Sequence, residues 1–473
     1  MNDKILVKTV TEPAREIKVV READVVVVGG GPGGVGAAVC AARTGADTVL
    51  IERYGHLGGM ASGGLVNIIP NLADIYGEQH IAGIVQEIVD RMDARGAASY
   101  PKKSDWGTTD KKVVDRYLNA SLGHFYIRKN DKLDKEIVLY SALVDPEVLK
   151  DELNDMVREA GATLYLHSWG TQPIMEGNRV KGVFFESKSG RQAILGKVVI
   201  DSTGDGDLLI PSGAEVITEM KRPSRITNLA FCFWITNVDN AKEDEFKAAQ
   251  PEKYDELMKE LAEKRGFARH FRGLLKDQES VIWFHPHIPA EDQTDVEEMT
   301  RIDIDTRKRA LITYEFLKKY VPGYEKSYIM QTAPQLGTTG GKRVVGEYVL
   351  KEEDMNTTEP FEDTIAVFAG NDRGELSHRY PKMHIPYRSL VPKKVEGLLV
   401  ACRAFSSDSA VNNQFNLIPH CLCFGQAAGT AAAMALDSGV SIRDVDIKVL
   451  QKNLKKQGVI LPEIKQPTKI VST

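Results

Sequence analysis

Three glycines in a short run have the spacing that brings a peptide backbone against a diphosphate. Gly29, Gly31 and Gly34 form a Gly-x-Gly-x-x-Gly sequence. The first glycine permits a tight turn, the second lets a pyrophosphate approach the backbone, and the third lets a helix pack closely on a strand. A helix that begins in this loop directs unpaired N–H groups and the positive end of its dipole at the phosphates. The spacing therefore indicates dinucleotide binding.

The segments around these glycines have the pattern of the elements that would position them. Asp24–Val28 is a β-branched apolar run typical of a central strand buried on both faces of a parallel sheet. A small-residue helix is expected over Val35–Arg43, and a second strand over Thr48–Ile51. That strand ends in Glu52, where an acidic side chain can accept hydrogen bonds from both ribose hydroxyls. An acid there argues against a ligand with a 2′-phosphate.

The residues after Glu52 favour FAD over NAD. NAD-binding domains normally continue into another βα unit, whereas this chain continues with a glycine-rich loop, Arg53–Gly64. Such a loop suits a chain that lies alongside an extended cofactor, where side chains would collide with the ring system.

With this ERYGHLGGMAS loop, the chain resembles the FAD-dependent oxidoreductase family of glutathione-reductase-type flavoproteins. It is similar, more distantly, to the flavoproteins of fumarate reductase and succinate dehydrogenase. Further matches are the strand end and turn at 197–207, the strand at 397–403 and the apolar segment at 417–433. The resemblance covers about residues 24 to 436. It implies an α/β fold, with a Rossmann-type, glutathione-reductase-like FAD-binding domain and a discontinuous, mixed α+β substrate domain.

The resemblance also implies which residues contact FAD. The expected set comprises the glycine loop, the strand end, the following loop, the Thr-Gly turn and a helix that points its N-terminus at the flavin: Gly29, Gly31, Pro32, Gly33, Gly34, Glu52, Arg53, Gly58, Gly59, Met60, Ser62, Thr203, Gly204, Asp205, Gly425, Ala428 and Gly429. His56 does not match the position at which succinate dehydrogenase attaches its flavin, so a noncovalent cofactor is expected. Two places depart from the family pattern, because 336–343 lacks a leading Arg-Glu pair and Asn416 stands where an Arg is common.

Candidate catalytic residues are those that can move a proton or hold a carboxylate. His420 and Arg388 rank first because their neighbours belong to family motifs, and His384, His285, His287, Arg343 and Arg403 follow. A histidine would supply the acid or base, and an arginine can hold a carboxylate with two parallel hydrogen bonds. No residues with the spacing of a metal site are apparent among the five cysteines, which also form no CxxC pair.

The order of the motifs implies discontinuous domains. The FAD-binding domain is expected to collect 1–75, 140–215 and 385–473, and the substrate or cap domain 76–139 and 216–384. Helices are expected at 83–92, 146–160, 251–270 and 296–319, and a buried strand at 229–235. A second glycine cluster at 337–341 lacks the strand and terminal acid of another nucleotide domain.

Composition favours a soluble enzyme over a nucleic-acid or membrane protein. The 473 residues have a net charge of −5, and no basic stretch suggests a nucleic-acid partner. The first residues are charged throughout, with no apolar signal segment, and 417–436 reads as a buried helix and not a membrane span. A cytoplasmic location is expected.

These observations predict an FAD-dependent oxidoreductase that transfers a hydride between a small organic substrate and flavin N5. Two alternatives stay open: a flavoprotein subunit that passes electrons to a partner protein, and a flavoprotein that modifies tRNA. Expected partners are the small-molecule substrate and either an electron-transfer protein or further copies of the chain.

Overall fold

A mixed seven-stranded sheet forms the centre of the larger part of the molecule. The computed structural model describes residues 9–118, 126–130, 134–219, 228–273, 278, 280–357, 359–370 and 382–463. The sheet has the order β8 (Thr163–Tyr165), β2 (Thr48–Ile51), β1 (Val19–Val28), β11 (Gly190–Asp201), β10 (Arg179–Ser187) and β9 (Trp169–Glu176), and β23 (Leu398–Val400) also pairs with β11. Pairing is parallel between β8, β2, β1, β11 and β23, and antiparallel where β10 joins β11 and β9. Its strands come from three separate stretches of the chain.

The predicted central strand is confirmed, because β1 lies between β2 and β11 and its last four valines are buried. Val25 and Val27 belong to the core on one side of the sheet, while Val26 and Val28 belong to the core on the other. Alternate side chains of a strand point to opposite faces, so a continuous apolar run fits this two-sided burial.

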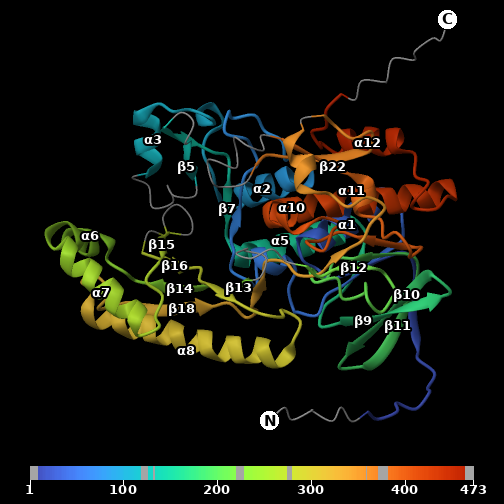
Figure 1. Ribbon diagram of the computed structural model, residues 1–473, viewed down its shortest axis with the longest axis horizontal. Helices are drawn as coiled ribbons and strands as arrows, with labels where there is room; N and C mark the ends of the chain where they lie inside the picture. The colour runs from blue at the N-terminus through green and yellow to red at the C-terminus, as the bar shows by residue number, and fades with distance from the viewer. Residues whose placement is uncertain are drawn as a thin grey trace, which may run out of the picture.

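Two glycine-containing helices pack closely against one another beside this sheet (Figure 1). They are α1 (Pro32–Arg43) and α11 (Ile418–Ser438), and α11 is buried along most of its length. A side chain at Gly425 would overlap the carbonyl oxygen of Gly33, and one at Gly429 would overlap that of Ala37. The glycines therefore set the short distance between the helices. Among the described residues, no helix is both long enough and apolar enough to cross a membrane.

A second region carries a four-stranded antiparallel sheet. Its order is β15 (Phe271–Arg272), β16 (Ile282–Phe284), β14 (Phe233–Thr236) and β18 (Tyr328–Thr332). Three helices, α6 (Asn240–Ala249), α7 (Pro251–Glu263) and α8 (Val296–Tyr320), lie with it at the lower left of Figure 1. The apolar residues of α7 and α8 form one core with alternate residues of β14 and β16.

The single strand predicted at 229–235 is wrong in one respect, because the chain forms two strands there. β13 (Asn228–Ala230) pairs with β17 (His287–Pro289) and β19 (Gly337–Thr338), whereas β14 belongs to the four-stranded sheet. Phe231 and Cys232 lie between the strands and are fully buried in different cores. An all-apolar run shows burial, but it carries no signal for the point at which a chain passes from one sheet to another.

The predicted helices agree closely with α2 (Ile84–Ala94), α5 (Pro146–Glu159) and α8, whereas the helix predicted at 251–270 is too long, because α7 ends at Glu263. Asp145 caps α5 by accepting hydrogen bonds from the backbone N–H groups of Glu147 and Val148. The remaining elements are β3 (Ile68–Ile69), β4 (Ala98–Ser99), α3 (Lys111–Leu118), β5 (Ile127–Asn130), β6 (Lys135–Val138), β7 (Ala142–Val144), β12 (Val216–Ile217), β20 (Arg343–Val344), β21 (Thr364–Phe368), β22 (Met383–Pro386), α10 (Ser409–Gln414) and α12 (Ile447–Lys456).

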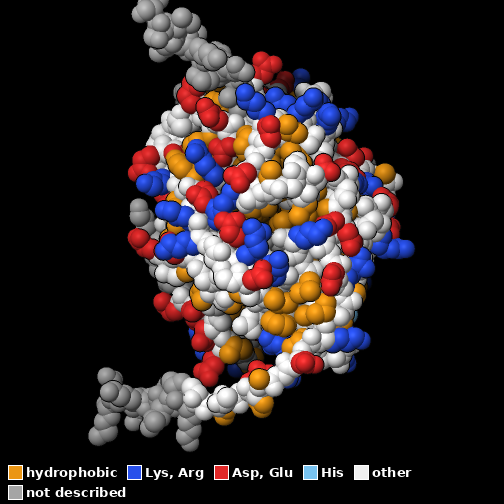
Figure 2. Space-filling view, turned by 90° about the vertical axis from the view of Figure 1, so that its right-hand side faces the viewer, with side chains coloured by type: hydrophobic (Ala, Val, Ile, Leu, Met, Phe, Trp, Pro, Cys, Tyr) orange, Lys and Arg blue, Asp and Glu red, His pale blue; other side chains and the backbone are white. Residues whose placement is uncertain are grey.

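Charges of both signs are interspersed on the face of the molecule that Figure 2 shows. That face carries no continuous basic area of the kind that tracks a nucleic-acid backbone.

Candidate functional site

A cavity of about 480 Å³ is lined by the glycine loop and by residues from distant parts of the chain. The glycine loop, the end of β2 and the loop that follows it are called the first wall. The turn after β11, the start of α8, the segment after β18, the residues after β23 and the start of α11 are called the facing wall, which meets the first wall where Thr203 lies against Gly29 and Cys421 lies near Gly33. Lining residues include Gly29, Gly31, Pro32, Gly33, Glu52, Arg53, Tyr54, Gly59, Met60, Trp169, Thr203, Gly204, Asp205, Asp207, Thr294, Val296, Met299, Gln335, Leu336, Thr338, Cys402, Arg403 and Cys421.

The glycines at the cavity divide into those that pack and one that faces open space. A side chain at Gly33 would overlap the carbonyl oxygen of Ala401, and one at Gly34 would overlap that of Gly29. At Gly31, by contrast, nothing lies within 4 Å of the point where a Cβ would stand. A Cβ at Gly59 would stand 3.0 Å from the Gly31 Cα, so Gly59 allows the two loops to approach closely. The backbone at Gly31 is thus open to a ligand.

The carboxylate of Glu52 is held by backbone N–H groups of the glycine loop and of the loop after β2. It accepts hydrogen bonds from the backbone N–H of Gly30 at 2.5 Å and from that of Tyr54 at 2.8 Å. Burial raises the pKa of the Glu52 carboxyl, and the two backbone N–H groups work in the opposite direction. The side chain lines the cavity, as does the exposed Trp169.

An ion pair lies on the facing wall of the cavity. Arg403 follows β23, and one of its terminal nitrogens donates to Asp205 at 2.7 Å and also contacts Thr338 Oγ1. The guanidinium lies over Gly204, where any side chain would collide with it. The Nε of Arg403 is buried and has no hydrogen-bond partner among the described residues. The Nε–H of Arg403 is therefore a hydrogen-bond donor without a partner among the described residues.

The acidic turn after β11 holds two further carboxylates. Asp201 accepts hydrogen bonds from the Thr203 N–H and hydroxyl at 3.0 and 2.8 Å, and from the Leu208 N–H at 3.0 Å, which fixes the turn. Asp207 lines the cavity, and burial together with the nearby Asp201 and Asp205 raises the pKa of its carboxyl to about 6.

Eleven of the seventeen predicted cofactor residues line the cavity: Gly29, Gly31, Pro32, Gly33, Glu52, Arg53, Gly59, Met60, Thr203, Gly204 and Asp205. The other six lie behind it. Gly34 packs against Gly29, Gly58 donates its N–H to the Gly30 carbonyl, and Ser62 donates its hydroxyl to the Leu57 carbonyl. Gly425, Ala428 and Gly429 lie on α11, where the two glycines contact α1.

Of the seven catalytic candidates, Arg403 lines the cavity, whereas His285, whose ring stacks on Trp283, and the five others do not. His420 is buried between Phe368 and Phe415, with its Nδ1 accepting from the Leu417 N–H at 3.3 Å. The structure places the other four on separate elements: Arg388 beside Tyr348, His384 on β22, His287 exposed on β17, and Arg343 on β20. Arg343 is fully buried and donates only to backbone carbonyls, among them those of Ser407 and Gly341. Their catalytic roles stay predictions.

Several cavity residues were not singled out from the sequence. Asp207 had a usable signal, because it stands two residues after Asp205 in the turn already identified. Val296, Met299 and Gln335 had none, since they reach the cavity through the packing of the second region.

The residues present fit an FAD molecule. The open space at Gly31 admits a diphosphate, the carboxylate of Glu52 lines the cavity, and Arg403 brings a positive charge to it. The first turn of α11 reaches the cavity through Cys421, which brings the positive end of a helix dipole there as well.

The chain was compared with family models, curated proteins and solved structures. A family model described as "FAD dependent oxidoreductase" matches residues 24–454. No curated protein matches the chain. Three similar solved structures are a p-nitrophenol 4-monooxygenase from Pseudomonas putida, an L-amino acid deaminase from Proteus myxofaciens and a geranylgeranyl bacteriochlorophyll reductase-like protein from Thermoplasma acidophilum. They are 11%, 13% and 14% identical, with TM-scores of 0.45, 0.43 and 0.43. The alignments cover 93%, 91% and 92% of this chain and 89%, 93% and 83% of those chains.

Proposed function

Since the chain belongs to the FAD dependent oxidoreductase family, we propose that it transfers a hydride between a small organic substrate and N5 of noncovalently bound FAD. The protein is an FAD enzyme, and the proposal concerns the reaction and the place of the cofactor. FAD supplies the hydride chemistry, while the protein supplies binding, orientation and electrostatics.

The observation that carries the proposal is that Glu52, Gly31 and Arg403 line one cavity. The anchored carboxylate of Glu52 suits the two hydroxyls of a ribose, and the open backbone at Gly31 suits a diphosphate. Both features belong to one short strand–turn–helix unit, β1–α1–β2, whose helix directs its N-terminus at the same space.

Arg403 is the residue of the facing wall that we assign to holding negative charge. Its guanidinium is fixed by Asp205 and Thr338, so binding an anionic group there costs little further ordering of the side chain. The first turn of α11 adds the positive end of a helix dipole at the same cavity. Together they favour a ligand that carries or develops negative charge.

The test begins with the purified protein loaded with FAD. Anaerobic photoreduction followed by a library of small oxidised compounds should return the absorbance of oxidised flavin only with compounds that accept the hydride. Gly31→Ala is the matched control, because a methyl group there enters the space assigned to the diphosphate without touching another protein atom. Folded wild-type protein that takes up no FAD would refute the cofactor site, and bound FAD that no small molecule reoxidises would refute hydride transfer to such substrates.

A further inference from the structure

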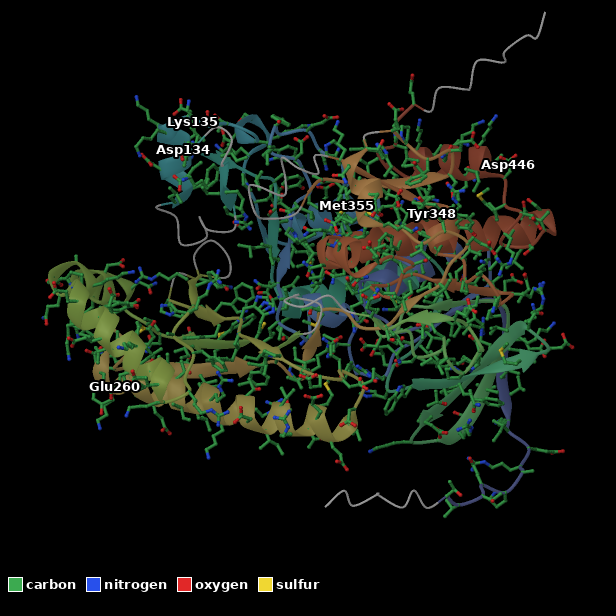
Figure 3. The ribbon with its side chains drawn as sticks, in the orientation of Figure 1. Asp134, Lys135, Glu260, Tyr348, Met355 and Asp446 are labelled. Carbon is green, nitrogen blue, oxygen red and sulfur yellow. The ribbon has the colours of Figure 1, made fainter. Side chains whose placement is uncertain are left out.

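The outer face of α8 is exposed along its length and carries an apolar centre. α8 has 25 residues and lies along the lower edge of the molecule in Figure 1, and side chains project from its lower side in Figure 3. Ile304 and Leu311 are 66% and 52% exposed, and they stand seven residues apart on one face of the helix. The opposite face, with Ile302, Thr306 and Ala310, is buried.

Charged residues continue this exposed face toward both ends of the helix. Glu297 and Arg301 lie before Ile304, and Glu315 and Lys319 lie after Leu311. Each is separated from its neighbours on the stripe by multiples of three or four residues, so all share the face of the two apolar side chains. Among the described residues, Glu297 and Glu315 form no ion pair, and Arg301 pairs only within its own helix, with Glu298. The charges thus lie in the order negative, positive, apolar, negative, positive.

We propose that this face pairs with the same face of a second copy of the chain, with the two α8 helices antiparallel about a two-fold axis beside Lys308. The order of charges is what selects this partner. Reversing the direction of one helix sets Glu297 against Lys319 of the second copy and Arg301 against Glu315 of the second copy. Because a two-fold interface uses the same surface twice, both ion pairs occur twice.

The centre of the same arrangement is apolar. Ile304 of each copy meets Leu311 of the other, and the pair removes from water two side chains that are exposed in the single chain. Lys308 is exposed next to the axis, where the two copies bring like charges together, and its flexible stem allows the ammonium groups to turn away into water. Because this repulsion weakens the proposed dimer, removing it should lower the dissociation constant, whereas changes to the ion pairs or to the apolar centre should raise it.

The pairing would act on the FAD cavity, because Val296 and Met299 at the start of α8 line it. Antiparallel helices place the end of the second copy's α8, with Lys319 and Tyr320, beside the start of the first. Association would therefore hold the α8 wall of each cavity in place. This inference concerns the assembly and does not depend on which reaction the cavity performs.

Sedimentation velocity of the FAD-loaded protein over a range of concentrations measures the association directly. We expect a concentration-dependent monomer–dimer equilibrium in the wild type, and a dissociation constant at least about 100-fold higher in Ile304→Asp/Leu311→Asp, which puts four carboxylates into the apolar centre. Val449→Asp is the control, because Val449 is a 44% exposed apolar residue on α12. Wild-type protein that stays monomeric at every concentration would overturn the proposal.

Charge reversal distinguishes the antiparallel pairing from nonspecific hydrophobic association. Glu315→Arg should weaken the dimer about tenfold, and Arg301→Glu/Glu315→Arg should restore it, because the double change rebuilds the two symmetry-related pairs between positions 301 and 315 with their signs exchanged. Lys308→Leu should tighten the dimer, since it removes the like charges at the axis. Glu263→Arg, an exposed charge reversal at the end of α7, is the control. Thermal unfolding of each variant shows whether its monomer remains folded.

Two outcomes of the charge series would overturn the antiparallel arrangement. The first is a double variant that stays as weak as Glu315→Arg, and the second is a Lys308→Leu variant that weakens the dimer. A dimer that none of the α8 substitutions changes would place the interface elsewhere on the molecule.

Discussion

The two walls of the FAD cavity are built in different ways. The first wall takes its backbone from one stretch of chain, Gly29–Gly59, and backbone geometry decides which residues fit there. The facing wall takes side chains from the start of α8, the segment after β18 and the residue after β23, which are far apart in sequence. A wall made of backbone requires glycines at fixed spacing, whereas a wall made of side chains requires only that the fold bring them together. The first kind of wall is therefore visible in a sequence and the second is not.

Among substitutions in the first wall, the largest effect on folding should come from Gly33. A methyl group there overlaps the carbonyl oxygen of Ala401, a backbone atom beside the central sheet that cannot move without disturbing β23. We expect Gly33→Ala to prevent accumulation of folded protein. Gly31→Ala should fold normally and bind FAD about 100-fold more weakly, a loss of about 2.7 kcal/mol, because its methyl group meets only the ligand.

Thermal unfolding without added FAD and titration of FAD fluorescence distinguish these two kinds of glycine. The distinction between a glycine needed for packing and a glycine needed for FAD binding would be wrong if Gly31→Ala unfolds the protein, or if Gly33→Ala binds FAD like the wild type. A Gly31→Ala protein that keeps full FAD affinity would move the diphosphate away from this loop.

On the facing wall, Arg403 should have the next largest effect. Arg403→Leu leaves the Asp205 carboxylate without its partner, and losing one member of a buried ion pair costs about 3–5 kcal/mol of unfolding free energy. The same change should weaken FAD binding, since the wall loses its positive charge. Arg388→Leu is the matched control: Arg388 is 45% exposed and lies over the Tyr348 ring outside the cavity lining. Its Nε is 3.5 Å from Asp363, and in the variant Asp363 keeps the backbone N–H of residue 388 as a donor. We expect it to cost no more than about 1 kcal/mol and to leave FAD affinity unchanged.

Urea unfolding and FAD titration of both variants check this pair of predictions. Equal effects of Arg403→Leu and Arg388→Leu would show that position on the cavity wall has no special importance. An Arg388→Leu protein that binds FAD normally but loses turnover would instead support the catalytic role predicted for Arg388 from its neighbours in the sequence.

The contrast between the walls explains how much could be predicted from the sequence. β1, α1, β2 and Glu52 were predicted closely, because a buried valine run, ordered glycines and a terminal acid each follow from a local physical demand. The passage from β13 to β14 had no such signal. Gln335 reaches the cavity only because the second region packs against the first.

His420 shows the same limit for a candidate catalytic residue. In the sequence it stands beside a family motif and carries a group that can move protons, which made it a natural candidate. In the structure its ring packs on Phe368 and Phe415, and its Nδ1 bonds to the backbone at the start of α11. Residue type and motif position do not report the direction of a side chain, which depends on the packing around the helix.

The smallest of the expected effects tests how the facing wall tolerates a buried acid. The pKa of Asp207 is raised from 3.8 to about 6, chiefly by burial and then by Asp201 and Asp205. Between these two values the folded chain holds a proton that the unfolded chain has released, so stability falls as the pH rises through that window. At pH 7.5 the ionised carboxylate costs about 1–3 kcal/mol, and Asp207→Asn should recover it. Urea unfolding should show a more stable variant at pH 7.5 and little difference near pH 3, where Asp207 is protonated in the folded state and mostly protonated in the unfolded state. Asp255→Asn on the exposed side of α7 is the control. If Asp207→Asn raises the free energy of unfolding equally at both pH values, then packing, and not the charge of Asp207, causes the lower stability of the wild type.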